Sequence, residues 1–254
     1  MEAGEFWSIG DYSIVGEFWG APGRDLAASI EPDGLDVIDL ATGTGVTAIA
    51  MAERGARSVV GVDAAPKLLR EAERRANAAA VDIEWIEADV AAVPLPDRAA
   101  DLVVSTFGII VADDPRTAIG ECRRLVRPGG RIVLTSWSGQ GLFGRIRQAL
   151  GPYFPDAPEP WHEDAAPIRA VVGPEAEVTT RSFMLTAETP EAFVAKLEQH
   201  NPPFIVGARA LGDRWPRARA DLLDVVAAAD QGDADGYRAV VDYLVITIDG
   251  VDRG

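Results

Sequence analysis

Hydrophobic and polar positions fall into alternating blocks between residues 35 and 137. Short apolar runs predict buried strands at 35–40, 58–63, 82–86, 101–105 and 131–137. Helical periodicity between these runs predicts helices at 46–53, at 66–79 and from about 113 to 126. Strands that alternate with helices in this way are typical of a parallel α/β sheet with helices on both faces.

The flanking segments have a weaker pattern. Residues 1–34 form an aromatic-rich lead-in, and residues 138–190 are rich in Pro and Gly. Thr189-Pro190 predicts the start of a helix, with the threonine as N-cap, and residues 213–230 also have a helical pattern. The apolar run Tyr243–Ile248 predicts a final strand.

The segment Asp39-Leu-Ala-Thr-Gly-Thr-Gly45 separates the first predicted strand from the helix at 46–53. A strand, a glycine turn and a helix start together form a nucleotide-type binding loop. Gly43-Thr-Gly45-Val-Thr-Ala48 also fits the dinucleotide pattern G-x-G-x-x-G/A, so an NAD(P)-dependent oxidoreductase is a real alternative.

The carboxylate of Asp39 favours a different ligand. At the end of the first strand it would repel a pyrophosphate, but it would attract the ammonium and sulfonium groups of S-adenosylmethionine (SAM). A unit pair at ~4 Å is worth roughly 4 kcal/mol at an effective dielectric of about 20. Backbone N–H groups near Thr44 and Gly45 would then face the methionine carboxylate.

Three further strand ends supply candidate contacts with SAM. Asp63 can accept both ribose hydroxyls, although it could instead be the N-cap of the next helix. Asp89 could accept the adenine amino group while Val90 donates its N–H, and the alternative is a surface turn aspartate. After the fourth strand, carbonyl groups near Ser105 and Phe107 could hold the ammonium, although core packing is an equal alternative for Phe107.

These motifs together resemble the class I SAM-dependent methyltransferases, and most closely the ubiquinone/menaquinone-biosynthesis-like branch. The lead-in from Gly10 to Trp19 is similar to the N-terminal segment of bacterial small-molecule methyltransferases. Ala41 departs from the pattern, because many members have the first glycine of the loop there. The motifs that carry the resemblance are Asp39-Leu-Ala-Thr-Gly-Thr-Gly45, Gly61-Val-Asp63, Glu87-Ala-Asp89 and Arg127-Pro-Gly-Gly-Arg-Ile-Val133.

The resemblance implies an α/β fold, a Rossmann-like three-layer sandwich. Its seven-stranded sheet would be mostly parallel with the last strand antiparallel, and 178–185 would be the hairpin-like neighbour of that strand. A single methyltransferase domain would comprise an N-terminal helical cap at 1–34, a SAM-binding core at 35–137, and an acceptor-site insertion with C-terminal strands at 138–254. The SAM-binding residues expected are Asp39, Ala41, Thr42, Gly43, Thr44, Gly45, Asp63, Ala64, Asp89, Val90, Ser105 and Phe107.

Methyl transfer from a sulfonium is an in-line displacement in which the protein mainly positions the reactants, which is worth roughly 7–11 kcal/mol. The product would be S-adenosylhomocysteine (SAH). His162 and His200 are the only imidazoles and thus candidate general bases, although an Asp or Glu could serve instead and the reaction could need no base. With two histidines and a single cysteine we expect no metal site. Tyr12 and Trp137 are candidates for lining an apolar or aromatic acceptor pocket, and Tyr12 could instead contact the methionine carboxylate.

The formal net charge of −16 disfavours nucleic acid and anionic membranes as partners. The N-terminus lacks the pattern of a signal peptide and no run of 18 apolar residues occurs, so we expect a cytoplasmic protein. The sequence leaves the oligomeric state open, with a homodimer as one option. A SAM-binding protein or cyclase that transfers no methyl group is a further alternative on the same fold.

Overall fold

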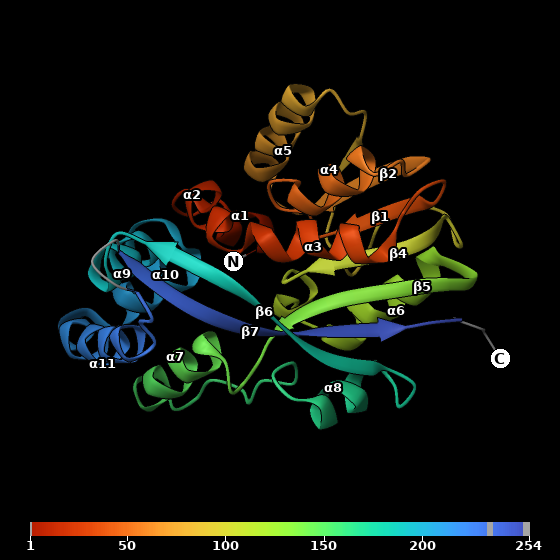
Figure 1. Cartoon of the computed structure of the whole chain (residues 1–254). Helices are drawn as coiled ribbons and strands as arrows, with labels where there is room; N and C mark the ends of the chain where they lie inside the picture. Colours follow the sequence, from red (N-terminus) through yellow and green to blue (C-terminus); the bar gives the residue numbers. More distant parts are fainter. Residues whose placement is uncertain (1, 233–235, 251–254) are drawn as a thin grey trace.

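The centre of the computed structural model, which describes residues 2–232 and 236–250, is a seven-stranded sheet. The strand order is β3-β2-β1-β4-β5-β7-β6, and β7 runs antiparallel to both of its neighbours while the other pairs are parallel (Figure 1). The predicted fold class is therefore confirmed. The strands are β1 Asp36–Leu40, β2 Ser58–Asp63, β3 Glu84–Glu87, β4 Ala100–Thr106, β5 Val126–Trp137, β6 Glu177–Ala187 and β7 Tyr237–Ile248.

Helices cover both faces of the sheet (Figure 1). The layer on one face consists of α3 Gly20–Ile30, α4 Val46–Glu53 and α5 Pro66–Ala79, and the other face carries α6 Pro115–Leu125 and α8 Ala165–Val172. The chain adds β2 and β3 on one side of β1 and then returns to add β4 and β5 on the other side. Because the crossover connections are right-handed, α4 and α5 lie on one face of the sheet and α6 lies on the other.

Further helices extend the two ends of the chain. The N-terminal cap contains α1 Ala3–Trp7, α2 Tyr12–Gly16 and the 3₁₀ turn η1 Glu17–Trp19. Helix α7 Leu142–Leu150 follows β5, and α9 Pro190–His200, α10 Pro202–Leu211 and α11 Trp215–Ala228 lie between β6 and β7. Short 3₁₀ turns occur at η2 Ile109–Val111, η3 Gly151–Tyr153 and η4 Gly212–Arg214.

Several element boundaries differ from the predictions. Strand β3 begins two residues late, and β7 begins at Tyr237 instead of Tyr243 because its first half is amphipathic. Strand β5 begins at Val126 instead of Arg131, so it includes the Arg127-Pro-Gly-Gly segment between the predicted helix and strand, and its pairing with β4 shifts register there. The expected pairing of β6 with β7 is correct, but α9, α10 and α11 connect the two strands, so they form no hairpin. Helices α8 and α10 were not predicted.

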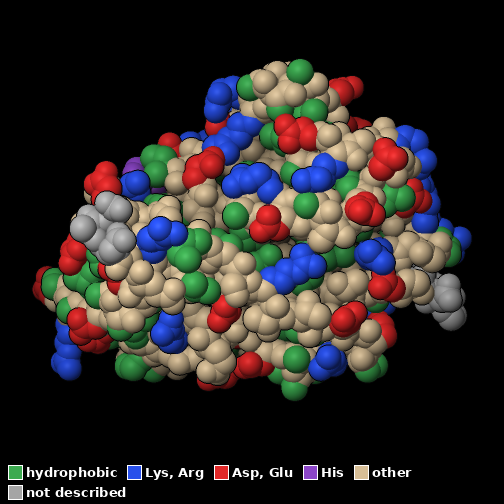
Figure 2. Space-filling model, in the orientation of Figure 1, with side chains coloured by type: hydrophobic (Ala, Val, Ile, Leu, Met, Phe, Trp, Pro, Cys, Tyr) green, Lys and Arg blue, Asp and Glu red, His purple; other side chains and the backbone are tan. Residues whose placement is uncertain are grey.

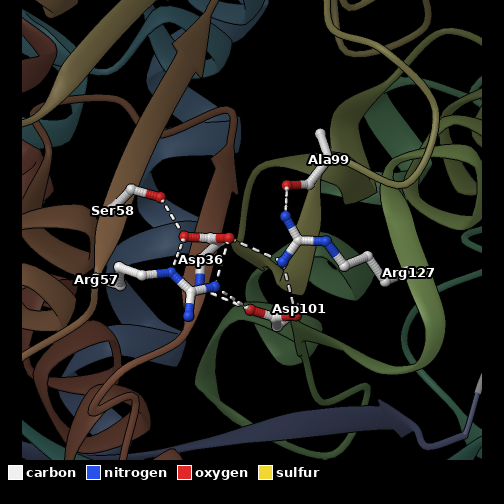
Figure 3. A network of polar contacts seen from close by, with 6 residues as sticks. All are labelled: Asp36, Arg57, Ser58, Ala99, Asp101 and Arg127. Carbon is white, nitrogen blue, oxygen red and sulfur yellow. Dashed lines mark hydrogen bonds and ion pairs between the residues drawn. The ribbon is translucent and has the colours of Figure 1, made fainter.

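A network of charged side chains joins β1 and β4 at the amino ends of these strands (Figure 3). Arg57 and Arg127 both bind Asp36, with N–O distances of 2.6 and 2.8 Å, and both also bind Asp101. The guanidinium of Arg57 and the hydroxyl of Ser58 hold the pKa of Asp36 well below its ordinary value. Arg127 therefore has a structural role at the sheet end opposite to the carboxyl ends of the parallel strands.

The surface carries both signs of charge despite the large negative total. Figure 2 shows Lys and Arg side chains interspersed with Asp and Glu on the face where α3, β6 and β7 lie. Among the residues described, no helix combines the length and apolar character that a membrane span requires.

Candidate functional site

A cavity lies at the carboxyl ends of the parallel strands β1, β2 and β4, beneath the N-terminal cap. It encloses about 1070 Å³ of space between atoms, including a part that is open to solvent. Figure 1 shows α1 and α2 beside these strand ends. The cap contributes Ala3, Trp7, Tyr12, Gly16, Trp19, Gly20 and Gly23 to the lining, and the remainder comes from the strand ends and the segments after them.

Specific contacts hold the cap over the turn between β2 and α5. The Nζ of Lys67 donates to the carbonyl of Gly10 at 2.6 Å, and Arg75 forms an ion pair with Glu17. Gly4 packs so tightly that a Cβ there would lie 2.2 Å from the carbonyl oxygen of Ala64. The cap is thereby joined to the elements that form the floor of the cavity.

The predicted glycine loop forms one wall of the cavity. Gly43 and Gly45 have φ angles of +58° and +78°, in the left-handed region that glycine adopts without strain. Gly43 lines the cavity, and a Cβ there would meet no atom within 4 Å. Gly45 does not line it, because its position faces Trp85 and Ala72.

Asp39 is buried at the end of β1, with 1% of its surface exposed. Its Oδ2 accepts hydrogen bonds from the hydroxyl of Thr42 at 2.6 Å and from the N–H of Ala48 at 3.2 Å. Its Oδ1 has no hydrogen-bond partner among the described residues. Burial raises the pKa of Asp39 to about 7, and the negative charge of Asp63 adds to this effect.

Asp63 and Asp89 lie at two further strand ends and line the same cavity. The two oxygens of Asp63 accept from the N–H groups of Gly43 and Ala65, both at 2.8 Å, and burial raises the pKa of this carboxyl. Ala65 is the N-cap residue of α5, so the N-cap alternative for Asp63 is wrong. Asp89 accepts from the N–H of Ala91 at 2.8 Å in an exposed turn, and it nevertheless borders the cavity beside Val90.

The charged residues of the lining share one sign. They are Asp39, Asp63, Asp89 and Asp113, and the lining that the structure describes contains no Lys, Arg or His. Two of these carboxylates are buried. Because an uncompensated buried carboxylate is costly, such a cavity favours a cationic ligand and disfavours a diphosphate.

Most of the predicted SAM contacts border this cavity, including Ala41, Thr42, Thr44, Ala64 and Phe107. Ser105 does not: it is fully buried, and its hydroxyl accepts from the N–H of Ile109 at 3.0 Å. The next residue, Thr106, lines the cavity instead, because successive side chains of a strand point to opposite faces. Its hydroxyl lies 2.8 Å from that of Thr47.

Trp137 lies behind the cavity wall and does not line it. Its ring stacks on Phe107 with centroids 3.8 Å apart and an interplanar angle of 5°. It also contacts Trp19 of the cap, with ring centroids 5.8 Å apart. We infer that Trp137 supports Phe107, which is strained at a φ of +57°, rather than contacting a ligand here.

Neither histidine reaches the cavity lining. His162 is tied to Ser136, whose hydroxyl lies 3.0 Å from the imidazole Nδ1 and donates to the His162 carbonyl at 2.6 Å. Burial lowers the pKa of His162. His200 ends α9, where its carbonyl packs against Gly10. The expectation that either imidazole serves as general base has no support from this geometry.

Tyr12 does line the cavity, as predicted for a substrate-binding residue. Its hydroxyl accepts from the indole N–H of Trp19 at 3.0 Å, so its own proton is available to a ligand. Burial raises the pKa of Tyr12 to about 12, which keeps the phenol protonated at neutral pH. Tyr12 is therefore a hydrogen-bond donor in this site and not a base.

Several lining residues were not among those predicted from the sequence. Gly16, Gly20 and Gly23 recur at helical spacing in residues 1–34, and this repeat of small residues is the signal that marks one face of the segment. Asp113 also lines the cavity, although its sequence position indicates only the start of the helix predicted from about 113. The cavity lining ends at Asp113, so no described residue of 138–254 borders it.

Comparison with known proteins agrees with the motifs. Residues 37–130 match the family model of a methyltransferase domain. An uncharacterized protein of Mycobacterium tuberculosis is 35% identical over 176 residues, which are 68% of this chain and 62% of that protein. Demethylmenaquinone methyltransferase of Thermus thermophilus is 39% identical over 131 residues, which are 50% of this chain and 59% of that enzyme. The chain thus spans about 60% of the length of these relatives.

Solved structures share the fold at low sequence identity. A presumed methyltransferase from Bacillus halodurans superposes with a TM-score of 0.58 at 17% identity, covering 88% of this chain and 96% of that one. The [4+2]-cyclase SpnF superposes with a TM-score of 0.51 at 17% identity, covering 88% and 78%. Fold and cavity together define a Rossmann-like methyltransferase architecture. Together with the family match and the relatives, they support a class I SAM-dependent methyltransferase, as the motifs predicted.

Proposed function

We propose that the protein binds SAM in this cavity and transfers its methyl group to a small-molecule acceptor, leaving SAH. The observation that carries the proposal is the charge of the lining: four aspartates and, among the described residues, no cationic side chain. Each carboxylate within ~4 Å of a phosphate would cost roughly 4 kcal/mol at an effective dielectric of about 20. An NAD(P)-dependent oxidoreductase is therefore disfavoured.

The residues of the cavity suit the separate parts of SAM. The unpartnered Oδ1 of Asp39 can accept from the ammonium, while the loop at Thr44 and the phenol of Tyr12 offer donors to the carboxylate. Asp63 retains lone pairs for the ribose hydroxyls, and Asp89 lies in the turn expected at the adenine. When bound, SAM supplies a methyl group already activated by the sulfonium.

The chain then has to position an acceptor and exclude water. Trp7, Tyr12, Trp19 and Phe107 border the cavity with aromatic surface, which favours an apolar or aromatic acceptor. With both histidines outside the lining, we propose catalysis mainly through alignment for in-line displacement, worth roughly 7–11 kcal/mol. In this proposal residues 1–34 cover the cavity of a single domain and residues 35–137 bind SAM. Residues 138–254 support the cavity wall from behind, where Phe143 packs on Trp19 and Trp137.

Calorimetric titration with SAM and with NADH tests the donor. We expect SAM to bind and NADH not to bind, and Asp39→Asn should weaken SAM binding at least tenfold at pH 8. Asp156→Asn is the matched control, because Asp156 is an exposed aspartate outside the cavity lining. Binding of NADH without SAM would overturn the proposal, as would an Asp39→Asn variant with unchanged SAM affinity.

Formation of SAH tests the transfer itself. A panel of aromatic, phenolic and quinone-like acceptors should include a substrate, whereas turnover of a small polar acceptor alone would contradict the proposed acceptor class. Tight SAM binding without SAH from any acceptor would favour the alternative of a non-methylating SAM-binding protein or cyclase. We further propose a cytoplasmic location and no nucleic-acid or membrane partner, given the charge of −16. The oligomeric state, for which a homodimer is one option, can be measured by light scattering.

A further inference from the structure

The two oxygens of the Asp39 carboxyl have different surroundings. Oδ2 is held by the hydroxyl of Thr42 and the N–H of Ala48, whereas Oδ1 has no partner among the described residues. Asp39 is also shielded from water, with 1% of its surface exposed. A buried carboxyl in this condition is stabilised either by a nearby cation or by holding a proton on its free oxygen.

Among the residues that the structure describes, the neighbouring elements supply no cationic side chain to the cavity lining. Strand β2 contributes Asp63, a second carboxylate, and α2 contributes the neutral phenol of Tyr12. Helix α4 and strand β4 contribute Thr47 and Thr106, whose hydroxyls bind each other. The charged residues that the turn after β3 and the segment before α6 contribute are Asp89 and Asp113, and both are exposed.

The charged residues of α3 and α5 lie outside the lining. On α3, Arg24 and Asp25 are exposed, and the helix presents Gly20 and Gly23 to the cavity. On α5, Lys67 donates to the carbonyl of Gly10, and Arg75 is paired with Glu17 and Glu71, while Leu68 borders the cavity. These surroundings explain why burial raises the pKa of Asp39 to about 7 in the ligand-free protein.

We infer that SAM binding is coupled to the release of a proton from Asp39: the free oxygen holds a proton in the empty site, and the incoming ammonium takes its place. The inference rests on the proposed function and adds to it a dependence on pH. No covalent bond to the ligand forms, and the O–H proton of Asp39 passes to the buffer. The ligand affinity should therefore rise as the pH rises, because the ionised form of Asp39 is the one that binds the ammonium.

The expected number of released protons follows from the midpoint of the Asp39 carboxyl, which lies near pH 7. At pH 6 about 0.9 of the Asp39 carboxyls would be protonated, so each binding event should release about 0.9 proton. Apparent affinity should fall by roughly 16-fold between pH 7 and pH 5.5. SAH carries the same ammonium as SAM without the sulfonium, so it should release the same number of protons.

Calorimetric titration with SAH at pH 6 measures the released protons directly. The enthalpy of binding is determined in two buffers with different ionisation enthalpies, and the slope between them gives the number of protons. Wild type and Asp156→Asn should both release about 0.9 proton. Asp39→Asn should release almost none, and 5′-methylthioadenosine, which lacks the ammonium, should release almost none from the wild type.

A second measurement does not depend on a variant. Carboxyl ¹³C resonances of the wild-type protein, titrated with and without saturating SAH, should show one aspartate with a midpoint near pH 7 that moves below pH 6 in the complex. SAH binding with no proton release at pH 6, or with equal release from Asp39→Asn, would overturn the inference and leave the proposed function intact. Failure of SAM and SAH to bind at any pH would instead overturn the proposed function.

Discussion

Alanine substitutions at Gly43 and Gly45 should separate a binding position from a packing position within one loop. Both residues have positive φ angles, of +58° and +78°. Gly43 borders the cavity, whereas Gly45 packs against the α5 helix and β3. We expect Gly43→Ala to lose ligand affinity with a small loss of stability, and Gly45→Ala to lose mainly stability.

The magnitudes follow from the space around each added Cβ. The left-handed conformation costs an alanine roughly 1–2 kcal/mol at either position. At Gly43 no atom lies within 4 Å of the new Cβ, so nothing is added to that cost. At Gly45 the Cβ would lie 2.9 Å from Cη2 of Trp85 and 3.0 Å from Cβ of Ala72, and relief of this overlap adds roughly 1–3 kcal/mol.

The ligand affinity should respond in the opposite order. The methyl group of Gly43→Ala would enter the space that the ligand needs, and a loss of at least tenfold in SAH affinity corresponds to about 1.4 kcal/mol. Gly34→Ala is a matched control, because Gly34 has a φ of +73°, has no atom within 4 Å of an added Cβ, and lies outside the cavity lining. It should cost the same roughly 1–2 kcal/mol without changing affinity.

Urea denaturation of the ligand-free variants measures their free energies of unfolding, and calorimetry with SAH measures affinity. Equal SAH affinity of Gly43→Ala and Gly34→Ala would show that Gly43 does not border the ligand. Equal destabilisation of Gly43→Ala and Gly45→Ala would contradict the open space at Gly43, because the added Cβ would then meet an obstacle absent from the structure.

Three further predictions concern single side chains. Because the pKa of Asp39 rises from 3.8 to about 7 on folding, wild-type stability should fall relative to Asp39→Asn as the pH rises from about 4 to 7. The limit is roughly 4 kcal/mol at ~1.4 kcal/mol per pH unit, and a pH-independent difference in urea denaturation would contradict it. Ala41→Gly should stabilise the protein by about 0.5–1 kcal/mol in the same assay, because Ala41 has a φ of +51°. A loss of stability in this variant would contradict backbone strain at Ala41. His162→Asn and His200→Gln should change the rate of SAH formation less than about twofold, since neither side chain lines the cavity, and a hundredfold loss would restore a histidine base.

Local patterns in the sequence were enough to predict the central elements. The predicted bounds of α4, β2 and α5 match the structure, because apolar periodicity and Pro66 at the helix start are signals that adjacent residues carry themselves. The same holds for Thr189, whose hydroxyl accepts from the N–H of Ala192 as an N-cap should. Asp39, Asp63 and Asp89, which the sequence placed at strand ends, line one cavity, since the ends of parallel strands meet at one edge.

The side chains that depend on distant contacts were harder to predict. Trp137 was expected to line the acceptor pocket, but its ring is occupied by Phe107 and Trp19, which come from other parts of the chain. Ser105 and Thr106 are neighbours on β4, and their side chains point to opposite faces of the sheet. A shift of one residue in the register would exchange the two faces. The two histidines had no local signal that could place them inside or outside the cavity.

The sequence by itself determined the alternation of strands and helices between residues 35 and 137 and the aspartates at the strand ends, because periodicity and strand termini are properties of neighbouring residues. Only the tertiary structure decided that the cap covers these aspartates without bringing a lysine or arginine into the cavity lining that the structure describes. It also decided that Oδ1 of Asp39 is buried without a partner within residues 2–232 and 236–250. Whether a carboxylate is buried, and whether a cation lies beside it, depends on which distant segments come together when the helices pack on the sheet.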